Sequence, residues 1–361
     1  MLEKRNSQVQ LSYRGTGALL TACAIFLGAC GSTGVSSTAS SQPVAPQTST
    51  PISVTVGSPS CAPCLAMSLL GNVDPHLQVT YQQFANATDA TTAVAAGKVD
   101  VAQIVYTGLV SAVSTGLPIV AISGEVNGAS DFIVGPNIKI KPNDWSALRK
   151  LIFADKKAGH LFTIASFFGT VQDIEIRLEL PLYGINPNTD VNIVNVPYPA
   201  MSAALQSGAA DAAAGVEPFA AYTLQNHLGE HFAYPYNQAA GNLTNVVVVA
   251  SSYLHAHPAA VVEIAKAMAK LIPYLKTPAG QAAWAAAIEK YDNQPASVVS
   301  AALQTVTPEI SMPFNHIKAI GVAMYKDGLI PSPVDTAALR KAVDYGPLEK
   351  ATGEGLSALG G

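Results

Sequence analysis

A short segment occurs twice in this chain, at an offset of 111 residues. The first copy is 93–107, AVAAGKVDVAQIVYT, and the second is 204–218, ALQSGAADAAAGVEP. At this offset Gly97 aligns with Gly208 and Asp100 aligns with Asp211. Glycine can take the left-handed conformation that ends a helix, and an apolar stretch follows each Asp. Each copy therefore predicts a helix, a turn in which the Asp bonds the local backbone, a strand and a polar loop.

The similarity between the two parts of the chain extends upstream. Residues 54–58, VTVGS, resemble residues 162–166, FTIAS, and each stretch predicts a strand that leads into a small polar loop before a helix. Apolar strand patterns and helical patterns alternate from Ile52 onward. The predicted strands are 52–56, 77–84, 99–104, 118–123, 161–165, 191–196, 210–216 and 245–250. The predicted helices are 63–70, 87–96, 108–115, 171–183 and 199–207, followed by a helical region from Pro258. A repeat with such a long period indicates two similar βαβαβ lobes whose strands pair in parallel.

Composition restricts the partners of the chain. Of its 361 residues 49% are hydrophobic and 12% are charged, and the net charge is -4. Nucleic-acid binding requires clustered Lys and Arg, and no basic block is present, so a nucleic-acid partner is excluded. After Arg14 the only arginines are Arg149, Arg177 and Arg340. We therefore expect that no arginine cluster holds a ligand.

The N-terminal residues predict export. Lys4, Arg5 and Arg14 precede an apolar run, 17–29, that is too short to span a bilayer. The run ends in Leu-Gly-Ala-Cys at 27–30, which resembles a bacterial lipobox. We expect a signal peptide at 1–29, lipidation of Cys30 and a flexible tether at 30–51, which is rich in Ser, Thr and Pro. The protein would then be lipid-anchored on the outer face of the cytoplasmic membrane or in the periplasm. An ordinary secretory signal is the alternative.

The order of elements and three motifs resemble the type II periplasmic-binding-protein superfamily, which has two crossover strands. Within it, the chain resembles the substrate-binding proteins of nitrate, sulfonate and taurine ABC importers, a family that includes binders of thiamine-pyrimidine precursors. The motifs are the two A-x-x-x-G-x-x-D-x-A segments, the turn 184–190, GINPNTD, and the segment 208–218, which ends in Glu-Pro.

This resemblance implies an α/β fold of two lobes. Lobe 1 would comprise 52–133 and 245–361, and lobe 2 would comprise 134–244. It also implies a monomeric receptor, without a cofactor, that captures a small organic solute of the sulfonate, taurine-like or pyrimidine-like kind. The receptor would deliver this solute to an ABC permease with its ATPase. A sensor or an adhesion lipoprotein with the same fold is a further alternative.

Candidate ligand-binding residues follow from strand order. Ligands of open parallel sheets lie beyond the carboxyl ends of strands, where helix N-termini offer unpaired N–H groups. The predicted ligand-binding residues are Ser58, Ser60, Tyr106, Thr107, Ser166, Phe168, Gly169, Thr170 and Glu217. Helix capping is the alternative role for the Ser and Thr residues, and core packing is the alternative for Tyr106 and Phe168.

The orientation of the Glu217 side chain bears on the class of ligand. If its carboxylate faces the ligand, it favours an aminosulfonate or aminopyrimidine with a hydrogen-bond donor over nitrate or a plain alkanesulfonate. Alternatively, Glu217 pairs with a residue such as Arg177 and does not touch the ligand.

Cys61 and Cys64 form a C-x-x-C motif after the first strand. Outside the cytoplasm a local disulfide is favoured. The alternative is a reactive thiolate, as in a sulfinate-cleaving C–S lyase of the same superfamily, in which His and Arg assist a cysteine. His76 is the only histidine between the signal peptide and Leu117, and no arginine lies between Arg14 and Arg149. We therefore expect a binding protein and not an enzyme.

Histidine spacing predicts no metal site. His227 and His231 have helical spacing, and His255 and His257 lie near a helix start. No Cys lies near either pair, and surface positions are expected for these histidines.

Overall fold

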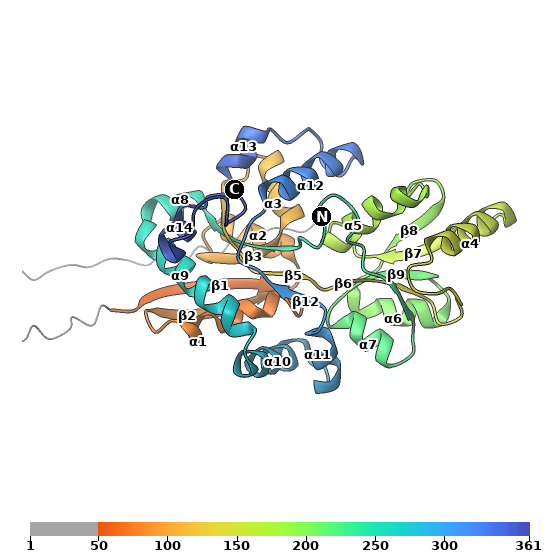
Figure 1. Ribbon diagram of the computed structural model, residues 1–361, viewed down its shortest axis with the longest axis horizontal. Helices are drawn as coiled ribbons and strands as arrows, with labels where there is room; N and C mark the ends of the chain where they lie inside the picture. Colours follow the sequence, from red (N-terminus) through yellow and green to blue (C-terminus); the bar gives the residue numbers. More distant parts are fainter. Residues whose placement is uncertain (1–49) are drawn as a thin grey trace, which may run out of the picture. The chain divides into compact units, whose positions relative to one another are not determined.

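A computed structural model describes residues 50–361, which contain two five-stranded sheets. We call each sheet with the helices packed on it a lobe (Figure 1). The predicted two-lobed α/β fold is therefore confirmed. The predicted signal peptide, the lipidation site Cys30 and almost all of the tether lie outside the described residues. Within 50–361, no helix has the length and apolar character needed to cross a membrane.

The first sheet has the strand order β2-β1-β3-β11-β4. Strand β1 (Ile52–Pro59) pairs in parallel with β2 (Leu77–Phe84) and β3 (Val101–Val105). Strand β11 (Asn245–Ala250) lies between β3 and β4 (Ile119–Gly124) and is antiparallel to both. The expectation of parallel pairing throughout is wrong here, because β11 brings the chain back from the second lobe. Every residue of β11 is buried, as expected for a central strand.

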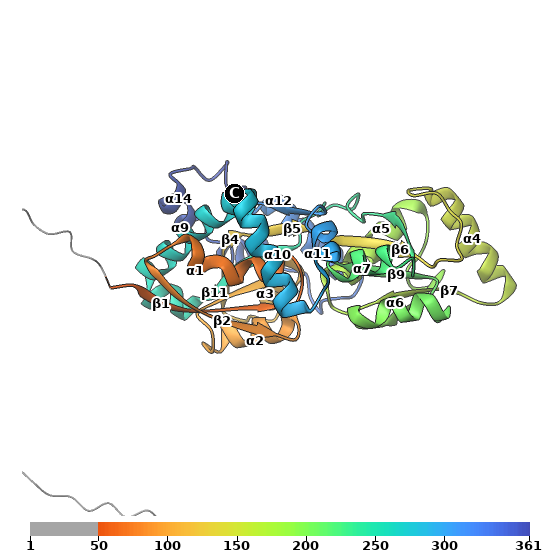
Figure 2. The same ribbon diagram turned by 90° about the horizontal axis from the view of Figure 1, so that it is seen from below.

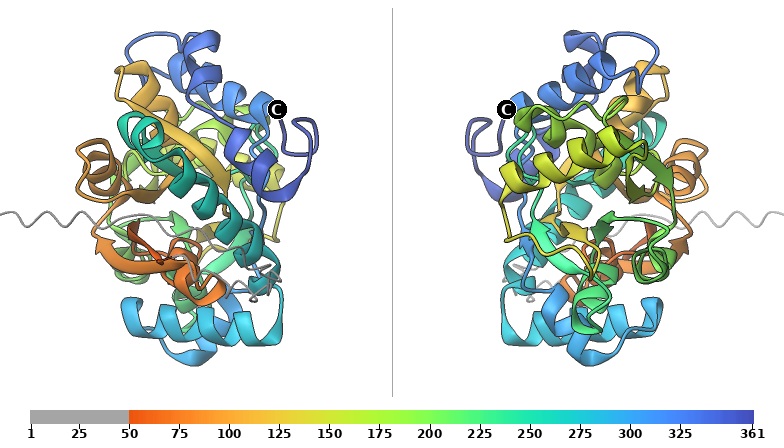
Figure 3. Two further views of the ribbon diagram at one scale, coloured as in Figure 1. Left: turned by 90° about the vertical axis from the view of Figure 1, so that its left-hand side faces the viewer. Right: turned by 90° about the vertical axis from the view of Figure 1, so that its right-hand side faces the viewer.

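Helices cover both faces of the first sheet, as Figures 1 and 3 show. One face carries a 3-10 helix, η1, and four α-helices: η1 (Cys64–Leu69), α1 (Leu70–Val73), α9 (Pro258–Leu275), α10 (Pro278–Asp292) and α11 (Ala296–Ala302). The second core, on the other face, is built by α2 (Ala87–Ala95), α3 (Tyr106–Ser114), α12 (Phe314–Lys326), α13 (Thr336–Lys341) and α14 (Gly346–Thr352). Helix α8 (Ser251–Ala256) follows β11. The predicted helical region after Pro258 thus packs on the first lobe.

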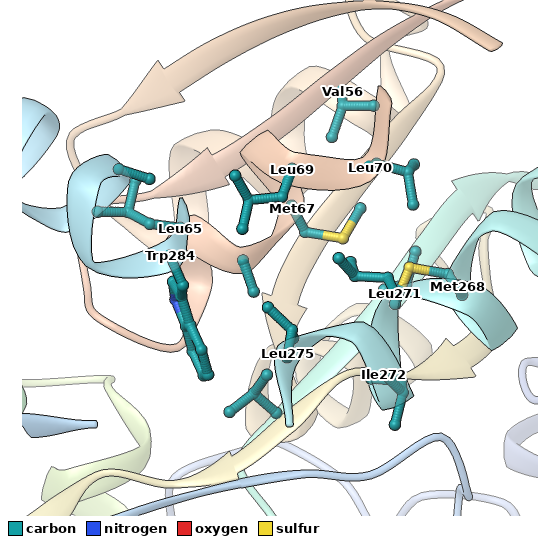
Figure 4. Packing of buried hydrophobic residues seen from close by; sticks show 14 of the residues in the cluster. Val56, Leu65, Met67, Leu69, Leu70, Met268, Leu271, Ile272, Leu275 and Trp284 are labelled. Carbon is teal, nitrogen blue, oxygen red and sulfur yellow. The ribbon is translucent and has the colours of Figure 1, made fainter. Parts of the chain in front are cut away.

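The core of the first face contains the largest fully buried side chain, Trp284 of α10. Its ring lies among Leu65, Leu275 and neighbouring apolar side chains (Figure 4). Because the Trp284 indole N–H donates a hydrogen bond of 2.7 Å to the carbonyl oxygen of Ala62, this core also positions the loop after β1.

The second sheet has the strand order β10-β6-β9-β7-β8. Its strands are β6 (Ser130–Val134), β7 (Phe162–Ser166), β8 (Val191–Asn195), β9 (Ala212–Val216) and β10 (Glu230–Ala233). One face carries α4 (Trp145–Ala158), α5 (Val171–Glu179) and the 3-10 helix η2 (Leu180–Tyr183). The other carries α6 (Tyr198–Ser207) and α7 (Phe219–Gln225), as Figure 2 shows. Helices α4 and α7 and strand β10 are not among the elements that the sequence predicts.

The chain passes between the sheets earlier than expected. All of β6, from Ser130, pairs with β9 in the second sheet, although the sequence placed residues 130–133 in lobe 1. The crossing segment contains β5 (Val126–Gly128), which pairs with β12 (Val306–Pro308). Every residue of β6 is buried. A fully buried strand has the same apolar pattern in either sheet, so the sequence does not show to which sheet β6 belongs.

Candidate functional site

A cavity of about 280 Å³ lies between the two lobes. The first lobe contributes 59–61, 63–64, 85–89, Val105 and Asn245; the connecting segments contribute Gly128 and Thr244; the second lobe contributes 167–172, Tyr198 and Val216. Most of these residues lie at or just after the carboxyl ends of β1, β2, β3, β7 and β9, or begin α2, α5 and α6. The position is therefore the one that open parallel sheets favour for a ligand, and the volume suits a small molecule.

A disulfide forms part of the first-lobe wall. Cys61 and Cys64 are joined, with their Cα atoms 5.1 Å apart, and both line the cavity. Their apolar neighbours include Ala129 and Val216, so the disulfide loop packs against the second lobe. Because both sulfur atoms are bonded, neither cysteine is the thiolate that the C–S lyase alternative needs.

Ser60 lies next to the disulfide and lines the same wall. Its hydroxyl group donates a hydrogen bond to the Asp292 carboxylate at the end of α10. Burial raises the pKa of Asp292 to about 6, and the bond to Ser60 opposes this rise. The Ser60 side chain is therefore oriented by a helix from the far end of the sequence.

The first turn of α2 borders the cavity and carries a carboxylate. Asn86 caps this helix, because its Oδ1 accepts a hydrogen bond of 2.9 Å from the Asp89 amide N–H. The Asn86 Nδ2 also donates to the Asp89 carboxylate at 3.0 Å. Asp89 lines the cavity and its side chain is exposed.

The loop before α5 forms the second-lobe rim. Gly169 has φ +79°, a conformation that glycine adopts without strain. The Thr170 hydroxyl caps α5 and donates a hydrogen bond of 2.6 Å to the Phe167 carbonyl oxygen. Phe168 keeps 46% of its surface exposed, and the Arg177 guanidinium lies 5.3 Å from the centre of its ring. The loop thus offers an aromatic surface on a fixed backbone.

Gln172 and Tyr198 form a rigid polar pair on the inner wall. The Tyr198 hydroxyl donates a hydrogen bond of 2.5 Å to Gln172 Oε1, and Gln172 Nε2 donates one of 2.8 Å to the Ser130 hydroxyl. Burial raises the pKa of Tyr198, so its phenol stays protonated and remains a donor. The Tyr198 ring also meets the Phe167 ring edge-on, with centroids 5.4 Å apart.

The start of β11 supplies Asn245, and the residue before it, Thr244, also lines the cavity; both are buried. Asn245 Nδ2 donates a hydrogen bond of 2.7 Å to the Val126 carbonyl oxygen. Its Oδ1 accepts a hydrogen bond of 2.8 Å from Gln103 Nε2. Gln172, Tyr198 and Asn245 line the cavity but are not among the ligand-binding residues that the sequence predicts. The one signal for Tyr198 is its position directly before the helix predicted at 199–207, which in the structure begins at Tyr198.

Some of the predicted ligand-binding residues line the cavity and others do not. Ser60, Phe168, Gly169 and Thr170 line the cavity, whereas Ser58 and Ser166 are fully buried and do not. Strands β1 and β7 continue through Ser58 and Ser166, so these side chains bond inside their lobes. The Ser58 hydroxyl lies 2.7 Å from the Tyr81 hydroxyl, and the Ser166 hydroxyl donates 3.0 Å to the Asp173 carboxylate.

Tyr106 and Thr107 do not line the cavity either, and the expected cleft exposure of Tyr106 is wrong. Helix α3 begins at Tyr106, two residues before the predicted start at Gly108. Its first turn therefore faces the core, where Tyr106 has no solvent-exposed surface and packs with residues such as Leu109. Core packing, the alternative raised by the sequence, is the observed role of Tyr106.

Glu217 is buried with 2% exposure and does not line the cavity, so its expected orientation toward a ligand is wrong. Its peptide bond to Pro218 is cis. Its carboxylate accepts hydrogen bonds from the Ala221 amide at 2.9 Å and from the Thr305 hydroxyl at 3.4 Å, not from Arg177. Burial raises its pKa to about 7, helped by the charge of Asp131. The Glu217 carboxylate therefore bonds the first turn of α7 and a residue of the C-terminal region.

Metal-ligating side chains converge away from the cavity. The ligand atoms of Asp74, His76 and Glu263 lie within 4.8 Å of one another. Asp74 already forms an ion pair with Lys270 at 2.5 Å, and Glu263 forms one with Lys266 at 3.0 Å, so cations already balance both carboxylates. Among the described cavity-lining residues, none is His and one, Asp89, is acidic. The cavity therefore has no ligand set that would select a metal.

Comparison with known proteins adds a family and a set of related folds. The family model described as the NMT1-like family matches residues 50–289. Among curated proteins, none matches the sequence at a significant level.

Three solved structures illustrate the related folds. The periplasmic nitrate-binding protein NrtA from Synechocystis PCC 6803 has a TM-score of 0.70 at 15% identity, over 83% of this chain and 88% of that chain. The alkanesulfonate-binding protein SsuA from Xanthomonas axonopodis pv. citri, bound to MOPS, has a TM-score of 0.64 at 16% identity, over 82% and 99%. The periplasmic aliphatic sulphonate binding protein SsuA from Escherichia coli has a TM-score of 0.63 at 18% identity, over 80% and 92%. At these identities the likeness establishes the fold.

Proposed function

This chain belongs to the NMT1-like family, and on that premise we propose that it is the solute-binding receptor of an ABC importer. The observation that carries the proposal is the cavity of about 280 Å³, lined from both lobes at the carboxyl ends of parallel strands. Of the related proteins named above, one is a nitrate-binding protein and two are sulfonate-binding proteins. The proposed ligand is a small organic solute of the sulfonate, taurine-like or pyrimidine-like kind.

The proposed contacts are the cavity-lining polar and aromatic groups. From the sequence-derived set these are Ser60, Phe168, Gly169 and Thr170, and to them we add Gln172, Tyr198 and Asn245. Closure of the two lobes over a solute would exclude water and strengthen each hydrogen bond. Catalysis is not part of the proposal, because the disulfide occupies both cysteines that the C–S lyase alternative requires.

Delivery of the solute needs partners outside this chain. We propose that a permease and its ATPase receive the solute, and that lipid on Cys30 together with the tether keeps the monomeric receptor near them. The Cys30→Ala variant tests the anchor, because it should move the exported protein from the membrane fraction to the soluble fraction. Unchanged membrane association of this variant would contradict lipid anchoring.

Solute binding is tested by the thermal stability of the purified protein with added compounds. The panel contains taurine, alkanesulfonates, nitrate and neutral heterocycles. A compound present at one hundred times its Kd stabilises the native state by about 2.7 kcal/mol. If no compound raises the unfolding temperature, the receptor proposal fails.

A further inference from the structure

We propose that the solute of this cavity is an uncharged organic compound with a flat ring and N–H donors, and that the cavity discriminates against carboxylates and sulfonates of the same shape. This inference rests on the proposed function and narrows its ligand class. It separates this chain from the ligands named for the related structures, which are anions.

The charge of the cavity wall opposes an anion. Among the described residues that line the cavity, none is Lys, Arg or His, and Asp89 is the one acidic residue. The guanidinium group of Arg177 lies over Phe168 but is held by an ion pair of 3.0 Å with Asp173. An anion in this cavity would therefore meet a like charge at Asp89 and lack a free cation to pair with.

Three hydroxyl donors of the wall already donate hydrogen bonds within the protein. Ser60 donates to Asp292, Thr170 donates to the Phe167 carbonyl oxygen, and Tyr198 donates to Gln172. Binding of an anion through these groups would break hydrogen bonds inside the protein, and each buried partner left unpaired costs free energy.

The first turns of α2 and α5 are the remaining source of donors, and each already contains an acid. Asp89 occupies the first turn of α2, and its amide is capped by Asn86. Asp173 occupies the first turn of α5, where its carboxylate accepts a hydrogen bond of 3.2 Å from the Gly169 amide. A carboxylate at a helix N-terminus already offsets the positive end of the helix dipole. These two helix ends are consequently poorer sites for a second anion.

The remaining surfaces suit a ring. Phe167 and Tyr198 meet edge-on, Phe168 is partly exposed, and the Cys61–Cys64 disulfide with Val216 supplies an apolar wall. Aromatic faces and sulfur atoms favour contact with a flat ring. The acceptors that remain available are the second lone pair of Gln172 Oε1 and the Asp89 carboxylate, and acceptors select ligand N–H groups.

Matched ligand pairs test the inference by equilibrium titration of the purified protein at neutral pH. The pairs are nicotinamide with nicotinate, and benzenesulfonamide with benzenesulfonate, because the members of each pair differ mainly in charge. We expect the neutral member to bind with a Kd at least about tenfold lower. In Asp89→Asn, the anions should bind several-fold more tightly because a like charge is removed, whereas the neutral members should bind more weakly because their N–H groups lose a carboxylate acceptor.

Tighter binding of the anionic members, or an equal effect of Asp89→Asn on both members, overturns the inference but leaves the receptor proposal standing. Absence of binding by both pairs, taurine and nitrate overturns both. The two failures are therefore distinguishable.

Discussion

Asp100 and Asp211 make the same hydrogen bond in the two lobes. Asp100 Oδ2 accepts a bond of 2.8 Å from the Thr55 amide, and Asp211 Oδ2 accepts one of 2.7 Å from the Thr163 amide. Each Asp amide donates in return to the carbonyl oxygen of the same Thr, at 3.0 Å and 2.8 Å. The repeated Asp thus ties the turn before β3 or β9 to the neighbouring strand, β1 or β7. The predicted bond to the local backbone is therefore wrong, because each partner Thr belongs to another strand far away in the sequence.

Removal of either carboxylate should destabilise the protein. In Asp100→Ala and Asp211→Ala, the Thr amide loses its partner, and we expect the free energy of unfolding to fall by about 1–3 kcal/mol. Asp100→Asn and Asp211→Asn keep an acceptor oxygen and serve as matched controls with a smaller loss. Urea unfolding measures these differences, and Ala variants that are as stable as the Asn variants would refute the structural role.

Glu217 should make stability fall as pH rises. Its pKa is raised to about 7 in the folded protein, so the native state binds a proton more tightly than the unfolded chain does. The stabilisation is complete below the ordinary pKa of a glutamate and is lost as the pH rises through 7. It amounts to roughly 3 kcal/mol.

Asp131 and His231 lie near this group, with His231 Nδ1 2.9 Å from the Asp131 carboxylate. That hydrogen bond raises the pKa of His231, so the contribution of His231 to the free energy of unfolding is also lost as the pH rises. Glu217→Gln should flatten the dependence of unfolding free energy on pH between 5 and 8 but leave the His231 part in place. It should also leave solute affinity unchanged, because Glu217 does not line the cavity. The same slope in the variant and the wild type would exclude Glu217 as its source.

The Cys61–Cys64 disulfide should support both stability and binding. It closes a short loop, for which loss of the bond costs about 2 kcal/mol. Because this loop lines the cavity and packs on Val216, we expect reductant to weaken solute binding as well. The Cys61→Ser, Cys64→Ser double variant should behave like the reduced protein and should not respond to reductant. Full affinity in that variant would show that the disulfide is dispensable for the site.

The Tyr198 hydroxyl should hold Gln172 in place for the ligand. Tyr198→Phe removes the 2.5 Å hydrogen bond to Gln172, and we expect solute affinity to fall about tenfold. Tyr222→Phe is the matched control, since Tyr222 is an exposed tyrosine of α7 outside the cavity lining. Equal affinities of the two variants would contradict this role.

Local sequence patterns were sufficient for most elements and insufficient for the site. The bounds of β2 and β11 agree with the predicted strands, because both have strong patterns between clear turn signals. Strand β1 is three residues longer than predicted, and this extension buries Ser58. The hydrogen-bond partners of Ala62 lie far away in the sequence. The Ala62 amide donates a hydrogen bond of 2.9 Å to the Glu217 carbonyl oxygen, and the Trp284 indole donates one to the Ala62 carbonyl oxygen. Pairings across such distances leave no local signal in one sequence.

The most direct test of the receptor proposal measures the Kd of a stabilising compound in two tryptophan variants of α2. Thr88 and Thr92 are both exposed and lie one turn apart, but only Thr88 lines the cavity. We predict that Thr88→Trp weakens binding at least about tenfold, because the indole enters the cavity rim, whereas Thr92→Trp binds like the wild type. Equal affinity of both variants and the wild type would contradict binding in the interlobe cavity.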